Sequence, residues 1–468
     1  DAWAQALVLL LIVAGAGLGL AVQSAAGRVR LAARGVSIWA GALILLSLAS
    51  ALRSPVPAYA LPAWAAAAAG LWLIAAATLL DADDRVRVEQ AVRVAAWVLT
   101  LLAFYQRLHG DARPAAAFPN QNVFAGAILL LLPFAVRRRD PLLVVGLLCA
   151  LWWTRSVGAW LGLAVALMLS RRAVGSIAAW AGALAGSIGL VAAYAKLESA
   201  ETLHRWAWWA AAWRMGYSAP LLGLGPGSFA YALPAYVPAG SGLSTLYAHQ
   251  HFLEIFAERG GPYLILWVGG LAALLWRARP GLRVGLVAAL VHGLVDYPLS
   301  IPGVFWLFCL SAGWTLPESD ESAAVRGGWR ISVAATALAA AAALGFWIER
   351  GWRAERLRAR AVDDFALGAP ARQVAVELAE SERLRPHPET ARFSAELALS
   401  RAAVGDEPGR RLVEAVAELE SAAALDPYRA SNWILLEEVY RRLGRPADAA
   451  DARRRGARTC PSLRAGLS

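Results

Sequence analysis

Long apolar runs, separated by short polar gaps, make up the first three quarters of the chain. They fall at residues 3–23, 36–52, 61–80, 91–108, 121–136, 141–154, 157–170, 174–194, 254–276, 282–297, 301–316 and 329–348. A helix needs about twenty apolar residues to cross the roughly 30 Å hydrocarbon core of a bilayer. The pattern therefore predicts an all-α fold, a polytopic transmembrane helical bundle with about twelve spans.

Composition agrees with a membrane protein. Of 468 residues, 59% are hydrophobic and 17% are charged, whereas about a quarter of the residues in a soluble domain are charged. The mean hydropathy is +0.49. These values exclude a water-soluble monomer, and the three cysteines indicate neither a disulfide framework nor a cysteine metal site.

Positive charge alternates between the gaps and so predicts the orientation. One set of gaps carries sixteen basic residues and the other carries seven. Because cytoplasmic loops are enriched in Lys and Arg, the richer set is predicted to be cytoplasmic. Residue 1 and the tail after residue 349 then lie on the outer side. Since the chain begins Asp1-Ala2-Trp3, we expect a missing N-terminal segment, either one further span or a removed signal peptide.

A change in composition near residue 350 divides the chain into two predicted domains. Residues 1–349 form the membrane domain, in which 195–250 is a long outer loop of interfacial helices. Residues 351–468 have the pattern of amphipathic helices, and prolines 386, 427 and 461 are 41 and 34 residues apart. The shorter interval resembles a tetratricopeptide (TPR) repeat, whose stacked units bind protein on a concave face. A short helical cap on the outer face is the alternative.

Polar residues inside or at the edges of membrane spans are costly and are often functional. In this chain they gather on the predicted outer side. They are Asn120, Asn122, Arg155, Arg205, Arg214, His249, His251, Glu254, Glu258, His292 and Asp296.

Structural roles are open for each of these residues. Asn120 and Asn122 can cap the following helix. Arg205 and Arg214 flank a tryptophan-rich segment that also suits a helix lying on lipid. His292 and Asp296 are four residues apart, so they share a helix face and can form a buried structural pair.

The remaining candidates have simple alternatives too. Glu254 and Glu258 can form a solvated face or pair with arginines. His249 and His251 lack a third ligand at zinc spacing, so no metal site is expected. Taken together, however, arginines at a membrane face can hold a diphosphate and stabilise it as it leaves. A neutral histidine can accept a proton from a sugar hydroxyl. The combination suits glycosyl transfer from a polyprenyl-diphosphate donor, and the net charge of +11 is not taken to indicate nucleic-acid binding.

Five segments in order resemble the O-antigen ligase family, which also includes O-antigen polymerases. They are FPNQNVFAGAILLLLP, TRSVGAWLGL, PLLGLGPGSF after an arginine-bearing loop helix, AHQHFLEIFAERGG and VHGLVDYPLSIPGVFWLF. The resemblance implies a metal-independent glycosyltransferase of the GT-C type, without a cofactor. It would use glycans on undecaprenyl diphosphate at the periplasmic face of a bacterial inner membrane.

Residue roles follow from the same resemblance. The essential loop histidine of the family falls on His249, which is followed here by Gln250 rather than Asn. The arginines that engage the diphosphate fall on Arg155, Arg205 and Arg214. The acceptor stays open between lipid A core, another glycan and a protein. Further substrate-binding candidates are Asn120, Asn122, His251, Glu258, His292 and Asp296.

Two other classes of protein fit parts of the pattern. A transporter would also have about a dozen spans with intramembrane His and Asp, and it predicts an internal repeat with broken helices. A scaffold would use the spans only to anchor the protein-binding tail.

Overall fold

The computed structural model describes residues 2–30, 32, 34–170, 200–238, 243–278, 280–318, 322–324 and 329–463. Over these residues the fold is helical, as predicted, apart from one short antiparallel pair of strands, β1 (Arg28–Arg30) and β2 (Ser322–Ala324). The helices up to the tail are α1 (Ala2–Ala25), α2 (Arg34–Arg53), α3 (Pro57–Ala77), α4 (Ala82–Leu108), α5 (Gln121–Arg137), α6 (Pro141–Thr154), α7 (Val157–Leu169), α10 (Ala200–Ser218), α11 (Phe229–Ala232), η1 (Leu233–Ala235), α12 (His251–Arg277), α13 (Pro280–His292), η2 (Pro298–Ser300), α14 (Pro302–Trp314) and α15 (Trp329–Ala366).

The helices coincide with the predicted spans, except that 174–194 lies outside the described residues. Within the described part of the chain, five helices are long and apolar enough to cross a membrane: α1, α2, α3, α4 and α15. Helices α5, α6, α7, α13 and α14 are apolar but shorter. The protein therefore has several helices capable of spanning a membrane, while the total of about twelve stays a prediction.

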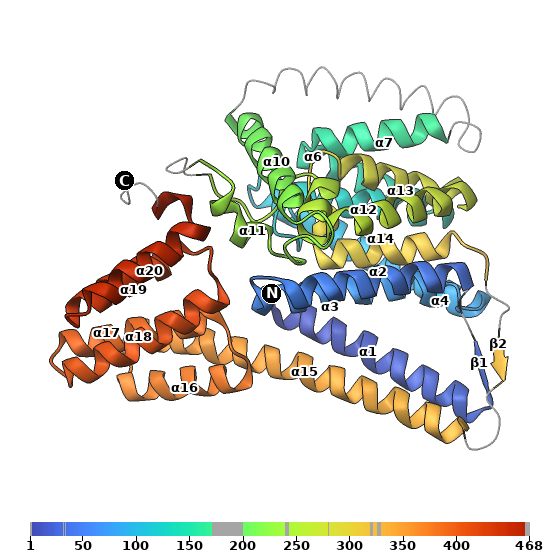
Figure 1. Ribbon diagram of the computed structural model, residues 1–468. Helices are drawn as coiled ribbons and strands as arrows, with labels where there is room; N and C mark the ends of the chain where they lie inside the picture. Colours follow the sequence, from blue (N-terminus) through green and yellow to red (C-terminus); the bar gives the residue numbers. More distant parts are fainter. Residues whose placement is uncertain are drawn as a thin grey trace.

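The membrane helices lie roughly along one direction (Figure 1). Helix α1 packs along α15, α3 packs between α2 and α14, and α13 packs against α5 and α7. One buried core joins α2, α3, α12 and α14, with Trp267 and Phe308 among its fully enclosed side chains. A second core joins α4, α5, α6, α7 and α13. Helix α10 lies outside these cores and packs on α12.

Helix α12 is broken at Gly260, which has φ 79° and ψ 176°. The ring centroids of His251 and Trp267 are only 6.3 Å apart, although sixteen residues of straight helix would extend about 24 Å. The two arms, residues 251–259 and 261–277, therefore fold sharply toward each other. Only glycine suits this turn, because a Cβ at Gly260 would lie 2.6 Å from the backbone of Leu221. The predicted span 254–276 is consequently not one straight crossing.

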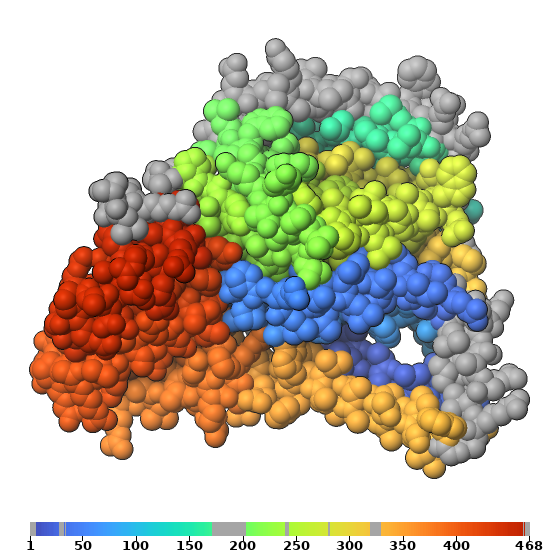
Figure 2. All heavy atoms as spheres, in the orientation of Figure 1, coloured from blue at the N-terminus to red at the C-terminus, as the bar shows by residue number. Residues whose placement is uncertain are grey.

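The tail follows α15 without an interruption. This single helix runs from Trp329 to Ala366 and so passes through the predicted domain boundary near residue 350. Five helices and a short 3₁₀ turn follow: α16 (Ala371–Leu384), α17 (Pro388–Ala403), α18 (Pro408–Leu425), α19 (Ala430–Arg442), α20 (Pro446–Thr459) and η3 (Pro461–Leu463). Each packs on the next in the chain, and together they form a lobe at one end of the bundle (Figures 1 and 2). The likeness to TPR repeats stays a prediction.

Candidate functional site

The carboxylate of Asp296, just beyond α13, is the centre of a cluster of polar side chains. Its Oδ1 lies 3.2 Å from Nδ1 of His249 and accepts a hydrogen bond of 3.0 Å from the backbone N–H of Tyr297. Its Oδ2 lies 3.9 Å from the guanidinium of Arg205 and 4.0 Å from Nε2 of His292. We call these five residues the His249 cluster. A buried carboxylate is stabilised when cations and hydrogen-bond donors surround it in this way.

Helix α10 supplies two of the contacts that hold the His249 cluster in place. Arg205 donates a hydrogen bond of 2.8 Å to the carbonyl of Val295, which ties α10 to the end of α13. One helical turn later, Trp208 stacks on the ring of His249 at 5.1 Å between centroids. Tyr297 presents its ring to the edge of the same imidazole at 4.6 Å. The imidazole is thus held on two sides by aromatic rings and at Nδ1 by a carboxylate.

The backbone around His249 is also fixed. His249 has φ 54°, a left-handed conformation that non-glycine residues adopt only when their surroundings hold them in it. The N–H of Ala248 donates a 2.7 Å hydrogen bond to Oε2 of Glu254. Oε1 of Glu254 accepts one of 2.5 Å from Ser300. Glu254 therefore connects the turn that presents His249 to the loop before α14.

These contacts define which nitrogen of His249 can take up a proton. Since a carboxylate only accepts hydrogen bonds, Nδ1 must carry the proton that faces Asp296. The other nitrogen, Nε2, is then the basic one. A histidine oriented by a carboxylate is a common arrangement for a general base.

Asn120 has both a structural contact and a contact with the site. Its Oδ1 accepts hydrogen bonds from the backbone N–H groups of Asn122 and Val123, at 2.9 and 3.0 Å, and so caps α5. Its amide donates to the hydroxyl of Tyr297. Asn120 is thereby placed against the His249 cluster, whereas Asn122 contributes its backbone to the cap.

Arg155 and Arg214 are not brought into the His249 cluster. Arg155 is exposed and ends α6 with φ 53°. It directly precedes Ser156, whose Oγ lies 3.4 Å from Nε2 of His292, so it stands at the edge of the cluster. Arg214 is exposed and lies nine residues beyond Arg205 on α10, about 13 Å along the helix axis. Their roles in binding a diphosphate stay predictions.

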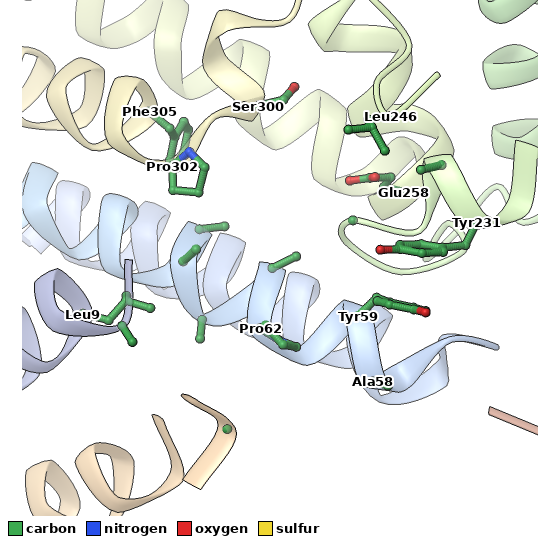
Figure 3. A pocket seen from close by; sticks show the side chains of 18 of the residues that line it. Leu9, Ala58, Tyr59, Pro62, Tyr231, Leu246, Glu258, Ser300, Pro302 and Phe305 are labelled. Atoms are coloured by element: carbon green, nitrogen blue, oxygen red, sulfur yellow. The ribbon is translucent and has the colours of Figure 1, made fainter. Parts of the chain in front are cut away.

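His251 and Glu258 line a separate cavity of about 540 Å³, which we call the Glu258 cavity. It lies between α3, α12, α14, α15 and the tail, and Figure 3 shows Glu258 and Ser300 on one side of it and Pro62 of α3 on the other. Oε1 of Glu258 accepts a 3.2 Å hydrogen bond from the N–H of Phe229. None of the five residues of the His249 cluster lines this cavity. The predicted site residues are therefore divided between two neighbouring places.

Tyr247 joins the two places. Its ring lines the Glu258 cavity and stacks on Tyr297 of the His249 cluster, with 4.4 Å between centroids. Among the described residues, no group of three or more His, Cys, Asp or Glu side chains is placed to hold a metal ion. Metal-independent chemistry stays a prediction.

The sequence analysis missed three residues that contact the site: Trp208, Tyr297 and Ser156. Trp208 lies three residues after Arg205 and therefore on the same helix face, which is a usable signal. Tyr297 directly follows Asp296. Nothing in the sequence around Ser156 indicated that it would meet His292.

One segment of the site is similar to a known family, whereas His292, Asp296 and Tyr297 lie beyond that segment. Residues 142–268 match the family model described as O-antigen ligase. The O-antigen ligase match extends from α6 into the second arm of α12 and includes Arg155, Arg205, Arg214 and His249. No curated protein is similar enough to the whole chain to count as a match. The family match, together with the apolar helices, supports a multi-pass membrane protein with a glycosyltransferase-like function in polysaccharide or lipopolysaccharide assembly.

Proposed function

We propose that the protein transfers a glycan from undecaprenyl diphosphate to an acceptor hydroxyl at the periplasmic face of a bacterial inner membrane. The observation that carries this proposal is the His249 cluster. A histidine with one nitrogen held by a carboxylate lies beside an arginine, and both lie within the segment that matches the O-antigen ligase family.

The chemistry assigns a role to each side of the cluster. Nε2 of His249 takes the proton of the acceptor hydroxyl as its oxygen attacks the anomeric carbon of the donor sugar. The bond between that carbon and the diphosphate oxygen breaks, and the diphosphate leaves with the electron pair. Arg205, with Arg155 at the edge of the cluster, stabilises the charge that grows on the leaving group. Guanidinium groups thus take the place of a divalent metal in a reaction of the GT-C type.

The other predicted residues would contact the substrates. His292 belongs to the cluster and Asn120 lies against it, while Arg214 and Asn122 would contact the parts of the donor that do not react. In this proposal the tail is periplasmic, forms TPR-like repeats and can bind a protein partner. The acceptor is lipid A core, another glycan or a protein hydroxyl.

The test is transfer from a lipid-linked glycan by purified protein in nanodiscs. His249→Ala and Arg205→Ala should each lower the rate at least about 100-fold, because one removes the base and the other a charge that stabilises the leaving group. Matched controls on the same predicted side are His109→Ala and Arg53→Ala, whose side chains are exposed. The controls should stay within about twofold of the wild type. Full turnover by both site variants would refute the proposal.

One observation favours a transporter as a second candidate. Helix α12 is broken at Gly260, and broken helices form ion and substrate sites in transporters. Uptake of a labelled glycan into proteoliposomes, with no transfer to an acceptor, would support this candidate instead.

A further inference from the structure

The Glu258 cavity has the size of a ligand site. Its volume of about 540 Å³ lies within the range of about 300 to 1,000 Å³ that is usual for small-molecule pockets. One part of its wall is apolar and comes from α1, α3, α14 and α15. The other part is polar and aromatic, and Figure 3 shows Tyr59 and Tyr231 lying against each other there. Their rings stack at 3.5 Å between centroids.

Four buried polar atoms on the residues that line this cavity have no hydrogen-bond partner among the described residues. They are Nε2 of His251, Nε1 of Trp267, Nε1 of Trp352 and the hydroxyl of Tyr59. His251 is 5% exposed and Trp267 is 1% exposed. Buried polar groups are nearly always paired, because an unpaired one is costly. Four such atoms around one cavity indicate a ligand that brings hydrogen-bonding groups of its own.

The break in α12 places two of these atoms together. His251 opens the first arm and Trp267 lies on the second. Their rings meet edge to face at 6.3 Å only because the arms fold toward each other at Gly260. The indole N–H is a donor, and the imidazole nitrogen can donate or accept according to its tautomer. The pair can therefore form hydrogen bonds with one hydroxyl group, which both donates and accepts.

Acidic and basic side chains line the cavity in equal number. They are Glu254, Glu258, Glu355, Arg259, Arg358 and Arg385. Burial and the nearby Arg358 lower the pKa of His387 to about 3, so this residue of the lining is neutral. A diphosphate would meet the carboxylates of Glu254 and Glu258, and a hydrocarbon chain would leave the polar atoms unpaired. A neutral ligand rich in hydroxyl groups suits the cavity best.

We propose that the Glu258 cavity binds a neutral saccharide, the terminal sugars of the acceptor. Trp267 and Tyr59 donate to sugar oxygens, His251 pairs with a hydroxyl, and the rings of Tyr59 and Tyr247 pack against the apolar faces of the sugars. Tyr247 and Tyr297 connect the cavity to His249, so a sugar chain that extends past them brings a hydroxyl to the base. The name acceptor rests on the proposed function, whereas saccharide binding does not.

The tail is part of this site. Arg385, at the end of α16, donates a hydrogen bond of 3.2 Å to the carbonyl of Ala58 in α3. It also lines the cavity, as do Ser381 of α16 and Thr390 of α17. The tail therefore closes one side of the saccharide site in addition to any protein that it binds.

Direct binding of labelled oligosaccharides tests the proposal. The full chain in nanodiscs is equilibrated with neutral tri- and tetrasaccharides of hexoses and N-acetylhexosamines, and with uronic-acid analogues of the same length. Trp267→Phe and Tyr59→Phe each remove one polar group and keep the aromatic ring. Each should raise the Kd for a neutral oligosaccharide about three- to tenfold, because the loss of one hydrogen bond weakens binding by about that factor.

Matched controls remove the same groups outside the cavity. Trp64→Phe loses an indole N–H that donates to Ile44, and Tyr236→Phe loses a hydroxyl that meets Ser218. Both should bind within about twofold of the wild type. Size-exclusion profiles identify any variant that has lost its fold, and in that case the remaining cavity variant decides the outcome.

Several results would overturn the proposal. These are a wild type that retains no neutral oligosaccharide, tighter binding of the uronic-acid analogues, recovery of phospholipid alone from the cavity, and unchanged Kd values in both cavity variants. Failure of the proposed function is a different result. If the proposed function is wrong, His249→Ala keeps the wild-type transfer activity while saccharide binding persists. If only the saccharide site is wrong, the wild type consumes lipid-linked donor but binds no neutral saccharide.

Discussion

The stacked rings of Tyr247 and Tyr297 join the Glu258 cavity to the His249 cluster, yet the two places use polar side chains differently. In the cluster, two histidines and one arginine converge on a single buried carboxylate. In the cavity, acidic and basic side chains line open space in equal number, and four polar atoms have no partner among the described residues. Convergence on one group fixes the geometry of a reacting side chain, whereas unpaired groups around a space favour a bound ligand.

Asp296→Asn should have the largest effect and should separate the two places. The amide keeps an oxygen for Nδ1 of His249 but removes the charge that orients the imidazole and faces Arg205. We expect glycan transfer to fall about 100-fold or more, while the Kd of a neutral oligosaccharide stays within about twofold. Steady-state transfer assays and equilibrium binding on the same preparation measure both. A parallel loss of saccharide binding would show that the cluster and the cavity are one site.

Gly260→Ala should damage both places, because the break in α12 sets the geometry of each. Alanine is strained at φ 79°, and its Cβ would meet the backbone of Leu221. We expect a loss of about 1–3 kcal/mol in the free energy of unfolding, visible as a lower Tm, together with weaker saccharide binding. The control is Gly269→Ala in the second arm, where a Cβ has no neighbour within 4 Å. If both variants have the wild-type Tm, the break does not depend on glycine.

Glu254→Gln tests the connection between the two places. Glu254 lines the cavity and also holds the backbone just before His249. Glutamine keeps one carbonyl oxygen for the N–H of Ala248, and its NH2 group can donate to the hydroxyl of Ser300, which then accepts. We expect the transfer rate of this variant to stay within about threefold of the wild type, and that of Glu254→Ala, which loses both contacts, to fall about tenfold or more. Equal rates for the glutamine and alanine variants would contradict a positioning role.

Asp426→Asn should have the smallest effect, a change in the stability of the tail. The tail lines the Glu258 cavity but supplies no residue of the His249 cluster. Burial raises the pKa of Asp426 from 3.8 to about 6. A raised pKa means that the folded state favours the proton, so Asp426 destabilises the tail increasingly as the pH rises from about 3.8 to about 6. Asparagine removes this cost and still accepts from Tyr428. The Tm of the variant, measured by differential scanning fluorimetry, should exceed that of the wild type by a few degrees at pH 8 and by only about a third of that at pH 4.5. A gain of the same size at both pH values would rule out titration of Asp426 as the cause.

Much of the fold could be predicted because its signals are local. Apolar runs located the helices, and Asn120 before such a run predicted the cap on α5. Prolines 386, 427 and 461 follow the ends of α16, α18 and α20, so the spacing of the prolines reflects the spacing of the tail helices. The sequence Gly260-Gly261-Pro262 could have indicated the break in α12, although the length of the apolar run masked it.

The site was less predictable, because side-chain convergence depends on helix rotation and bend angle. The charge pattern placed Arg155, Arg205 and Arg214 on one side of the membrane, but only Arg205 points into the cluster. His249 and His251 are two residues apart but belong to different places, because His249 has a left-handed backbone conformation and His251 begins α12. The meeting of His251 with Trp267 depends on the angle between two arms, which no local pattern specifies.

The continuity of α15 has a mechanical consequence. Its 38 residues form a rod of about 57 Å, and Trp347 and Ile348 from the middle of that rod line the cavity. With no joint between the last span and the tail, a change in the tilt of that span moves the far wall of the cavity as well. Because a mismatch between helix length and bilayer thickness is one cause of helix tilt, we expect the thickness of the surrounding bilayer to affect the width of the Glu258 cavity.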